Sequence, residues 1–318
     1  MTALFESVVI VTRKTELDEL IRRFNTRAQA KFYLEQGGHT MDGIEAAHDS
    51  YQRVLTDLRA ALPSKLKQQV IDREQVPQFL FGEQDLVVTI GQDGLVSNTA
   101  KYLDGQPIFA INPDPARYDG VLLPFRAGAF EPQLRAALAG ETDTRAVRLA
   151  EAVSSNNQSL LAFNDFFVGA RSHVSARYDI AVGGRREHQS SSGVIVSTGA
   201  GSTGWLQSVY AGAAGIVTAL GGRVTPPPDN GRLPWDSEKL VFSVREPFPS
   251  QITQVSLVHG YCSAESPLEL VSHMGTNGIV FSDGVESDYI EFNAGTKVSI
   301  RPADRLARLI VGPGSESA

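Results

Sequence analysis

Two short, mainly apolar segments separated by a glycine-containing turn place the strongest constraint on the fold of this chain. Segments 85–90 (DLVVTI) and 107–112 (PIFAIN) lack the polar alternation of a strand with one solvated face, so each predicts a strand covered on both faces. Between them lie the turn 91–94 (GQDG) and a helical stretch that runs to about Leu103. A strand, a helix and a strand at this spacing predict a βαβ unit with a parallel sheet and a right-handed crossover.

The residues before this unit extend the same pattern. The β-branched run 8–12 (VVIVT) predicts another buried strand, and Thr15 is a candidate N-cap for a helix over 17–24. Segment 46–62 has apolar residues at a 3.6-residue period and is followed by Pro63, which predicts an amphipathic helix that ends there. The amino half is therefore predicted to be α/β.

Beyond Phe125 the pattern changes to short apolar runs separated by Gly, Asn and Asp. Gly183-Gly184 and Asp283-Gly284 are typical of hairpin turns. Helices are expected at 131–138 and after Trp205, and strands at 178–182, 194–197, 239–244, 252–258, 278–281, 289–292 and 297–300. The fold class is therefore α/β plus β, with an α/β nucleotide-binding domain at 1–125 and a mostly β, antiparallel domain at 126–318. An alternative left open is that the C-terminal end returns to the first domain.

Composition excludes several classes of function. The chain has 29 Lys and Arg against 36 Asp and Glu, and a formal net charge of −7 is the wrong sign for a nucleic-acid-binding protein. Cys262 is the single cysteine and no run approaches the ~20 apolar residues of a membrane span, so we expect a cytoplasmic protein without a membrane partner. The six histidines show no ligand spacing, and no metal site is predicted.

The turn 91–94 is the first candidate site. It lies where a parallel strand ends and a helix begins, the edge at which open α/β sheets bind anionic ligands. Gly91 and Gly94 allow the backbone to approach a phosphate, and the Asp93 carboxylate can accept a proton from a hydroxyl or hold Mg²⁺. The alternative is that Asp-Gly only makes a turn and caps the helix.

The second candidate is the loop 197–205 (STGAGSTGW), which lies between a strand and a helix. Its small residues, with Gly201, Ser202 and Thr203 at their centre, expose N–H and hydroxyl groups of the kind that hold phosphate or ribose, and Trp205 can stack on a base. One alternative is a flexible connector. Another is a hydrolase with Ser202 as nucleophile, Asp236 as acid and His259 or His273 as base, although that motif needs a parallel sheet.

Asn164-Asp165 is the third candidate, because paired polar side chains at the edge of the apolar stretch 160–163 can hydrogen bond to ribose or adenine. A simple turn is the alternative. We expect the carboxylate of Asp93 and the hydroxyl-bearing segment near Thr203 to meet in a shared crevice.

In this order, the three motifs resemble those of the NAD kinase family, within the wider group that includes diacylglycerol and sphingolipid kinases. The turn 91–94 is similar to the GGDG signature, Asn164-Asp165 to an Asn-Glu pair, and 198–203 to a T-x-G-S-T loop. Segments 279–284 and 292–300 resemble the closing β-hairpin. Segments 112–115 (NPDP), 178–180 (YDI) and 191–193 (SSG) are most similar to the mitochondrial-type branch. The resemblance spans about 8–310.

The resemblance implies a Rossmann-like amino domain, a β-sandwich-like carboxyl domain, and a homo-oligomer, commonly a dimer. It also implies ATP, Mg²⁺ and NAD as ligands. Asp93 is then expected to take the proton of the adenosine ribose 2'-hydroxyl, while Asn164, Asp165, Thr203 and Trp205 hold the dinucleotide.

Four positions depart from the family pattern. Gln92 replaces a glycine, Leu95 a threonine and Ser192 an aspartate, and Gly204-Trp205 stands for Ala-Tyr. Because Gln92 and Leu95 lie at the phosphate turn, two alternatives stay open: a non-catalytic NAD(P)-binding or regulatory protein, and a kinase of the same fold that acts on a sugar or lipid hydroxyl.

Overall fold

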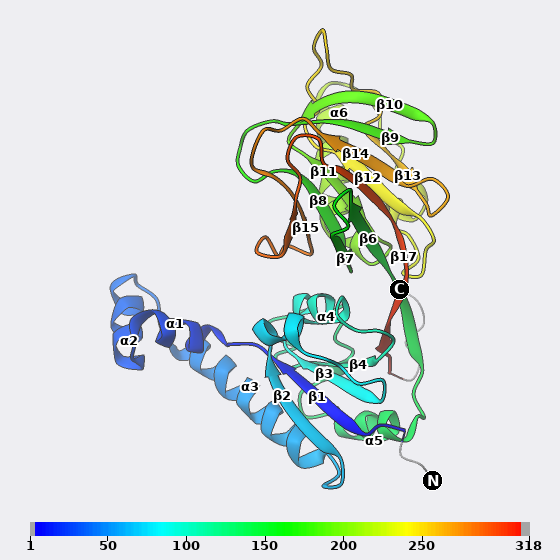
Figure 1. The fold of residues 1–318 in the computed structure, drawn as a ribbon. Coiled ribbons are helices and arrows are strands. Elements are labelled where there is room, and N and C mark those ends of the chain that lie inside the picture. The colour runs from blue at the N-terminus through cyan, green and yellow to red at the C-terminus, as the bar shows by residue number, and fades with distance from the viewer. Residues whose placement is uncertain (1–3, 313–318) are drawn as a thin grey trace. The chain divides into compact units, whose positions relative to one another are not determined.

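The computed structural model describes residues 4–312 and divides the chain into two compact units (Figure 1). The first unit extends to Arg145 and includes the residues from Arg308 onward, and the second is Ala146–Ala307. The chain therefore passes from one unit to the other twice, once within strand β6 (Thr144–Ser154) and once within β17 (Lys297–Ile310).

The first unit is built on a parallel sheet in the order β2-β1-β3-β4, with the end of β17 beside β4. Its strands are β1 (Ser7–Thr12), β2 (Lys67–Asp72), β3 (Asp85–Ile90), β4 (Pro107–Asn112) and the short β5 (Phe125–Arg126). Strands β3 and β4 coincide with the two apolar segments of the sequence, and every residue of β3 is buried. The βαβ prediction is confirmed.

Helices cover both faces of this sheet. Helices α3 (Asp42–Ala61) and α5 (Glu131–Ala139) pack through Val54, Leu58 and Leu134 on alternate strand residues such as Ile10 and Val88. Helix α4 (Asp93–Ala100) and the 3-10 turn η1 (Arg73–Gln78) contact the sheet and each other. The predicted helix after β3 is three residues too long, because α4 ends at Ala100.

Two short helices precede α3. Helix α1 (Glu16–Phe24) begins at the predicted cap, where the Thr15 hydroxyl accepts from the Asp18 amide and the Asp18 carboxylate accepts from the Thr15 amide. Helix α2 (Arg27–Gln36) was not predicted, and it packs through Ala30 against Leu17 and Met41.

The second unit is a sandwich of two mainly antiparallel sheets. The first has the order β10-β9-β14-β17-β6-β7, and the second has the order β13-β12-β11-β8-β15-β16. The strands not yet given are β7 (Ser159–Ala162), β8 (Asp165–Ala170), β9 (Ala176–Val182), β10 (Arg185–Ser191), β11 (Val194–Ser197), β12 (Leu240–Val244), β13 (His259–Cys262), β14 (Leu268–Ser272), β15 (Gly278–Ser282) and β16 (Tyr289–Glu291).

The core of the second unit lies between these sheets. Tyr178, Ile180 and Leu270 come from the first sheet, and Phe166, Val196 and Phe242 from the second. Six of the seven predicted strands are present, but 252–258 is not a strand. The α/β plus β fold class, with a Rossmann-like unit and a sandwich-like antiparallel unit, is confirmed.

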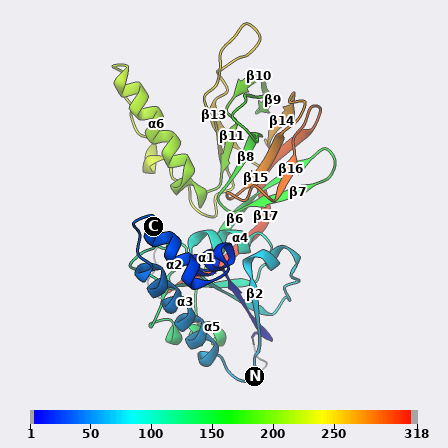
Figure 2. The same ribbon diagram turned by 90° about the vertical axis from the view of Figure 1, so that its left-hand side faces the viewer.

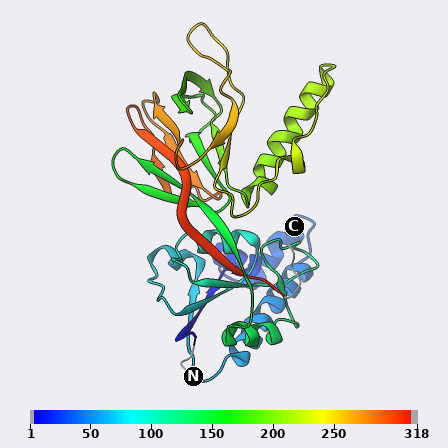
Figure 3. The same cartoon turned by 90° about the vertical axis from the view of Figure 1, so that its right-hand side faces the viewer.

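A long helix, α6 (Trp205–Ala219), follows the loop 198–204, in which η2 (Gly201–Thr203) forms a single turn. Figures 2 and 3 show that α6 extends away from the sheets of its own unit. The turn η3 (Pro228–Gly231) lies in the largely exposed loop that follows α6. No helix among residues 4–312 combines the length and apolar character that a membrane-spanning helix needs.

Candidate functional site

The predicted phosphate turn lies at the carboxyl end of β3. The Gly91 amide donates to the Ile111 carbonyl at 3.2 Å, which keeps β3 and β4 paired up to this point. Gln92 is the N-cap of α4 and forms no side-chain cap hydrogen bond. The first N–H groups of α4 are thus left without a side-chain cap, an arrangement that favours an anion.

Asp93 is the first residue of α4 and is partly exposed. Its Oδ1 accepts a hydrogen bond from the Leu122 amide at 2.7 Å, which orients the carboxylate. Among the described residues, this is its only hydrogen-bond donor, so Oδ2 is available to a ligand.

The glycines of this turn have different roles. A Cβ at Gly91 would lie 3.1 Å from Leu95 Cδ2 and 3.1 Å from Arg13 Cδ, so Gly91 makes room for those side chains. A Cβ at Gly94 would meet no atom within 4 Å, and Gly94 is exposed. Leu95 is buried and therefore does not project into the open space beside Gly94.

A cavity of about 200 Å³ opens beside Gly91 and Gln92 within the first unit. Its other walls come from the chain after β1, from α3 and from the loop after β4. They include Arg13, His48 and Arg117 as basic or titratable groups, with Tyr51, Asp114 and Tyr118. Glu16 also lines the cavity, so basic and acidic side chains both lie beside this helix terminus, whose N–H groups favour an anion.

In the second unit, hydrogen bonds to the backbone of Phe163 and Asn164 connect three of the sequence motifs. The Asp283 carboxylate accepts from the Phe163 amide at 2.9 Å and from the Asn164 amide at 2.6 Å. The Thr198 hydroxyl donates to the Phe163 carbonyl at 2.6 Å, and the Thr198 amide donates to the Asn164 carbonyl at 2.9 Å. Asn164-Asp165 is therefore held from one side by the 198–204 loop and from the other by the Asp283-Gly284 turn.

The same loop approaches Asn164 so closely that only glycine fits at one position. A Cβ at Gly201 would lie 2.0 Å from the Asn164 carbonyl oxygen. A Cβ at Gly199 would lie 1.9 Å from the Pro234 carbonyl oxygen. These contacts order the loop, so it is not a flexible connector.

Ser202 is fully buried in this loop. Its hydroxyl donates to the Gly199 carbonyl at 2.6 Å and accepts from the Leu233 amide at 3.1 Å. Neither partner is a histidine, and the strand before the loop, β11, is antiparallel to both of its neighbours. The hydrolase alternative therefore lacks its geometry. Thr203 and Gly204, which follow, are exposed.

Asp165 is an acid near these motifs whose pKa is strongly raised. Burial, together with the negative charge of Asp283, raises the pKa of Asp165 to about 7. No hydrogen bond to its carboxylate comes from the described residues. A carboxyl group held in this way near neutral pH is typical of binding and catalytic sites.

We predict that Asp165→Asn stabilises the protein above neutral pH. The native state holds the Asp165 proton to about pH 7, whereas the unfolded chain releases it near pH 4. The native state therefore binds more protons between these values, and the wild-type contribution to stability falls as pH rises through that window. Because one pKa unit corresponds to about 1.4 kcal/mol, the gain is on the order of 4 kcal/mol at pH 8 and small near pH 4.

Urea unfolding at both pH values measures this gain, with Asp57→Asn on the exposed face of α3 as the matched control. A gain of equal size at pH 4 and pH 8 would contradict the assigned pKa.

Trp205 lines a second cavity, of about 380 Å³, within the second unit. Its ring stacks on Phe167 at a centroid distance of 6.0 Å, and the Arg245 guanidinium lies 5.6 Å from its centroid. Phe281, Arg171 and Ser192 also line the cavity. Aromatic surfaces beside two guanidinium groups suit an aromatic, anionic ligand such as a nucleotide.

The structure thus places the predicted residues in two groups. Gly91, Asp93 and Gly94 belong to the first unit, whereas Asn164, Asp165, Gly201, Ser202, Thr203 and Trp205 belong to the second. The expectation that the two groups meet in one crevice stays a prediction. Sequence reasoning did not find Asp283 or Arg245 as site residues, although Asp283-Gly284 stood out as a turn.

Comparison with known proteins adds evidence on the fold. No family model matches the chain, and no curated protein matches its sequence. The structure of an NAD kinase from Archaeoglobus fulgidus in complex with ATP is 20% identical in sequence, covers 96% of this chain and 94% of its own, and has a TM-score of 0.55.

Yeast NADH kinase, solved as a complex with NADH, is 15% identical, with coverage of 97% of this chain and 84% of its own and a TM-score of 0.59. Both similarities span both units. The chain therefore has the two-domain fold of the NAD kinases.

Proposed function

We propose that this protein is an ATP-dependent kinase that phosphorylates the adenosine ribose 2'-hydroxyl of NAD. The observation that carries the proposal is Asp93. Its carboxylate lies at the uncapped start of α4, is fixed through one oxygen by the Leu122 amide, and has the other oxygen available. A phosphotransferase of this fold needs such an oriented base beside a phosphate-binding backbone.

In this mechanism Asp93 Oδ2 accepts the proton of the 2'-hydroxyl as the hydroxyl oxygen bonds to the γ-phosphorus of ATP. The bond between that phosphorus and the β–γ bridging oxygen breaks, and ADP leaves. Asn164, Asp165, Thr203 and Trp205 hold the dinucleotide, with Gly201 and Ser202 keeping the loop in place. Mg²⁺ would be held chiefly by the substrate phosphates and would neutralise charge on the transferred phosphoryl group, which leaves Asp93 Oδ2 to take the proton.

The direct test is to mix the full-length protein with ATP, Mg²⁺ and NAD and to measure NADP with an NADP-specific coupled enzyme. NADH, a sugar and a lipid alcohol serve as competing acceptors, because one neighbour of the same fold is an NADH kinase. Formation of NADP supports the proposal. Phosphorylation of the sugar or lipid alone would replace NAD as the acceptor.

One observation favours a second candidate, a non-catalytic NAD(P)-binding protein. Gln92, which stands where the family has glycine, lines the cavity beside the phosphate turn. A side chain at that point can exclude the phosphate donor from the backbone. Saturable NAD(H) or NADP(H) binding without turnover for any donor and acceptor would select this candidate.

We also propose that the protein forms a homodimer through α6. Ile216 is 64% exposed and Leu220 is 83% exposed, and this helix is apolar along most of its length. Exposed apolar surface of this kind is typical of an interface between copies. We further propose that the protein is located in the cytoplasm, because a free thiol such as that of Cys262 is typical of a reducing compartment.

If the dimer forms there, Ile216→Glu should convert it to a monomer in sedimentation velocity, because a carboxylate would be buried unpaired at the interface. Thr218→Glu, which places the same charge on the opposite side of α6, should remain a dimer. A wild-type protein that sediments as a monomer would refute the proposal.

A further inference from the structure

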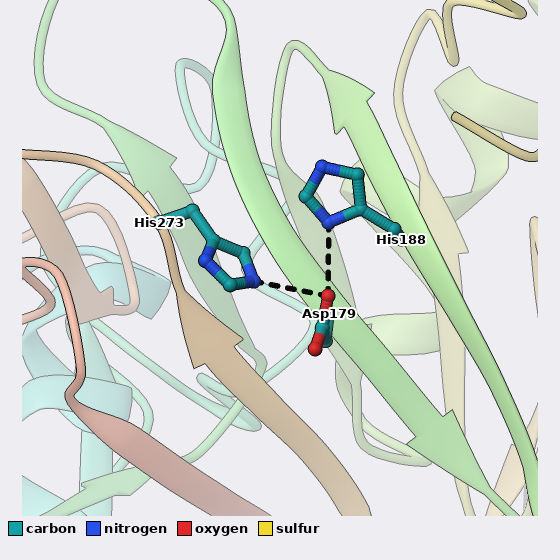
Figure 4. Close-up of side chains that lie close together, drawn as sticks. All are labelled: Asp179, His188 and His273. Atoms are coloured by element: carbon teal, nitrogen blue, oxygen red, sulfur yellow. Dashed lines mark hydrogen bonds and ion pairs between the residues drawn. The ribbon is translucent and has the colours of Figure 1, made fainter. Parts of the chain in front are cut away.

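Three metal-ligating side chains that the nucleotide chemistry does not use lie together on the second unit. Figure 4 shows His188 and His273 on either side of Asp179, with both rings directed at its carboxylate. Asp179 Oδ1 is 2.9 Å from His188 Nδ1 and 3.0 Å from His273 Nε2. One ligand atom from each residue lies within 4.8 Å of the other two.

The sheet brings these residues together from three neighbouring strands. His188 on β10 is paired directly with Asp179 on β9. His273 follows β14 on the other side of β9, and its amide donates to the Arg177 carbonyl at 2.8 Å. The cluster occupies the face of β9 opposite the core, because the adjacent residues Tyr178 and Ile180 point into the sandwich.

The backbone at His188 is fixed on its outer side as well. Its amide donates to Gln254 Oε1 at 3.0 Å, and its carbonyl accepts from the Gln254 amide at 2.9 Å. Ligand positions on paired strands are held more precisely than those on loops. The three donors therefore approach one another on a fixed frame, and only side-chain rotation is needed to adjust them.

We propose that Asp179, His188 and His273 form a binding site for a divalent first-row transition metal ion, with Zn²⁺ as the best fit. Metal–ligand distances of about 2.0–2.1 Å in a tetrahedral site require ligand atoms about 3.3 Å apart. The two nitrogen–oxygen separations of 2.9 and 3.0 Å are already close to this value. Two imidazoles and one carboxylate with an open fourth position are a ligand set that Zn²⁺ accepts.

Exposure of the cluster allows the ion to enter and water to complete its coordination. The side chains of Asp179, His188 and His273 are 26%, 34% and 44% exposed. The ion binds an unprotonated ring nitrogen, so a neutral imidazole moves the proton that faces Asp179 to its other ring nitrogen, and a charged imidazolium releases that proton to solvent. Nitrogen donors also select against Mg²⁺, which prefers oxygen ligands, so this site is not the one expected to serve a kinase reaction.

One neighbouring charge opposes the metal. Arg186 Nε lies 4.0 Å from Asp179 Oδ2, and its guanidinium repels a second cation. The competing account of the cluster is an ion-pair network in which Asp179 serves only the two histidines and Arg186. The two accounts differ in the role of Arg186. Removal of its guanidinium weakens the ion-pair network, whereas at a metal site it removes a positive charge that repels the ion.

The test is titration of the full-length protein with ZnCl₂ by isothermal calorimetry, and with CoCl₂ followed by visible absorption, both in the presence of Mg²⁺. We expect a single equivalent of Zn²⁺ and d–d bands typical of four- or five-coordinate cobalt. Removal of a residue that only hydrogen bonds to a metal ligand weakens metal binding by about 10- to 100-fold. His188→Gln, His273→Gln and Asp179→Asn should therefore each weaken binding by about 100-fold or more.

Two matched variants complete the design. His173→Gln removes a histidine outside the cluster and should bind as the wild type does. Arg186→Gln should bind at least as tightly as the wild type. Zn²⁺ binding that survives all three ligand substitutions, or no saturable binding of Zn²⁺ or Co²⁺, would overturn the proposal. NADP formation by the same variants reports separately on the kinase proposal, which this inference does not need.

Discussion

Asp93→Asn is expected to lower NADP formation by about 10³-fold, while nucleotide affinity and unfolding stay close to those of the wild type. A positioned general base contributes about 10²- to 10⁴-fold to a proton-transfer step. The asparagine Oδ1 can still accept from the Leu122 amide, whose donor–acceptor distance is 2.7 Å. The orientation of the side chain is therefore kept, and only its ability to take a proton is lost.

The measurement is kcat and KM for NAD with ATP in excess, together with a thermal-shift titration of both nucleotides. Asp119→Asn, an exposed position in the loop that leads to Leu122, is the matched control and should retain full activity. A fully active Asp93→Asn protein would remove Asp93 from the reaction. A protein that loses affinity to the same extent as kcat would make it a binding residue instead.

The parallel sheet of the first unit could be predicted from the sequence, because its strands are apolar on both faces. Segments 85–90 and 107–112 have no polar alternation, and the structure gives strands with those bounds. Strand β2 (KQQVID) was missed because it is an edge strand, and most of its residues are exposed or partly exposed. Its sequence therefore lacks the apolar run on which the prediction depended.

Segment 252–258 shows why periodicity can fail within a sandwich. The segment (ITQVSLV) is rich in β-branched and apolar residues, as in a strand, yet side chains replace some of the ladder partners. The Glu187 carboxylate accepts from the amides of Ser256 and Leu257, and the Gln254 amide donates to the His188 carbonyl. Leu257 is still buried, so the apolar residues of this segment correctly indicated burial although the segment is not a strand. The hydrogen-bond partner was a side chain 70 residues away in sequence, which no local pattern reveals.

The same distinction applies to the site residues: those beside a local element could be predicted, and those joined by contacts distant in sequence could not. Asp93 and Asn164-Asp165 could be proposed because each follows or begins a recognisable local element. The hydrogen bonds of Asp283 with the Phe163 and Asn164 amides join positions 120 and 119 residues apart in the sequence. The cluster of Asp179, His188 and His273 was not predicted for the same reason. Its residues are brought together by neighbouring strands and have no characteristic spacing along the chain.

Gly201→Ala is expected to destabilise the protein by about 3 kcal/mol even without nucleotide. The added Cβ would lie 2.0 Å from the Asn164 carbonyl oxygen, 2.5 Å from its carbon and 2.9 Å from the Asn164 Cα. These are backbone atoms that no rotamer change can move, so the loop or β8 must shift. Overpacking of this kind costs about 1–3 kcal/mol, and the bonds from Thr198 to Asn164 weaken with it.

Gly215→Ala is the matched control, because a Cβ there meets nothing within 4 Å and Gly215 lies inside α6, about 100° around the helix from Ile216. Alanine in an exposed helix interior should stabilise the protein by about 0.5–1 kcal/mol. Urea unfolding of both variants, with and without saturating NAD, separates two reasons for the glycine. If Gly201 serves the packing of the loop on Asn164, stability falls without ligand and affinity falls with it. If Gly201→Ala leaves the unfolding midpoint unchanged and lowers only the affinity for NAD, the glycine serves the approach of the ligand, and the packing of the loop on Asn164 is not what requires it.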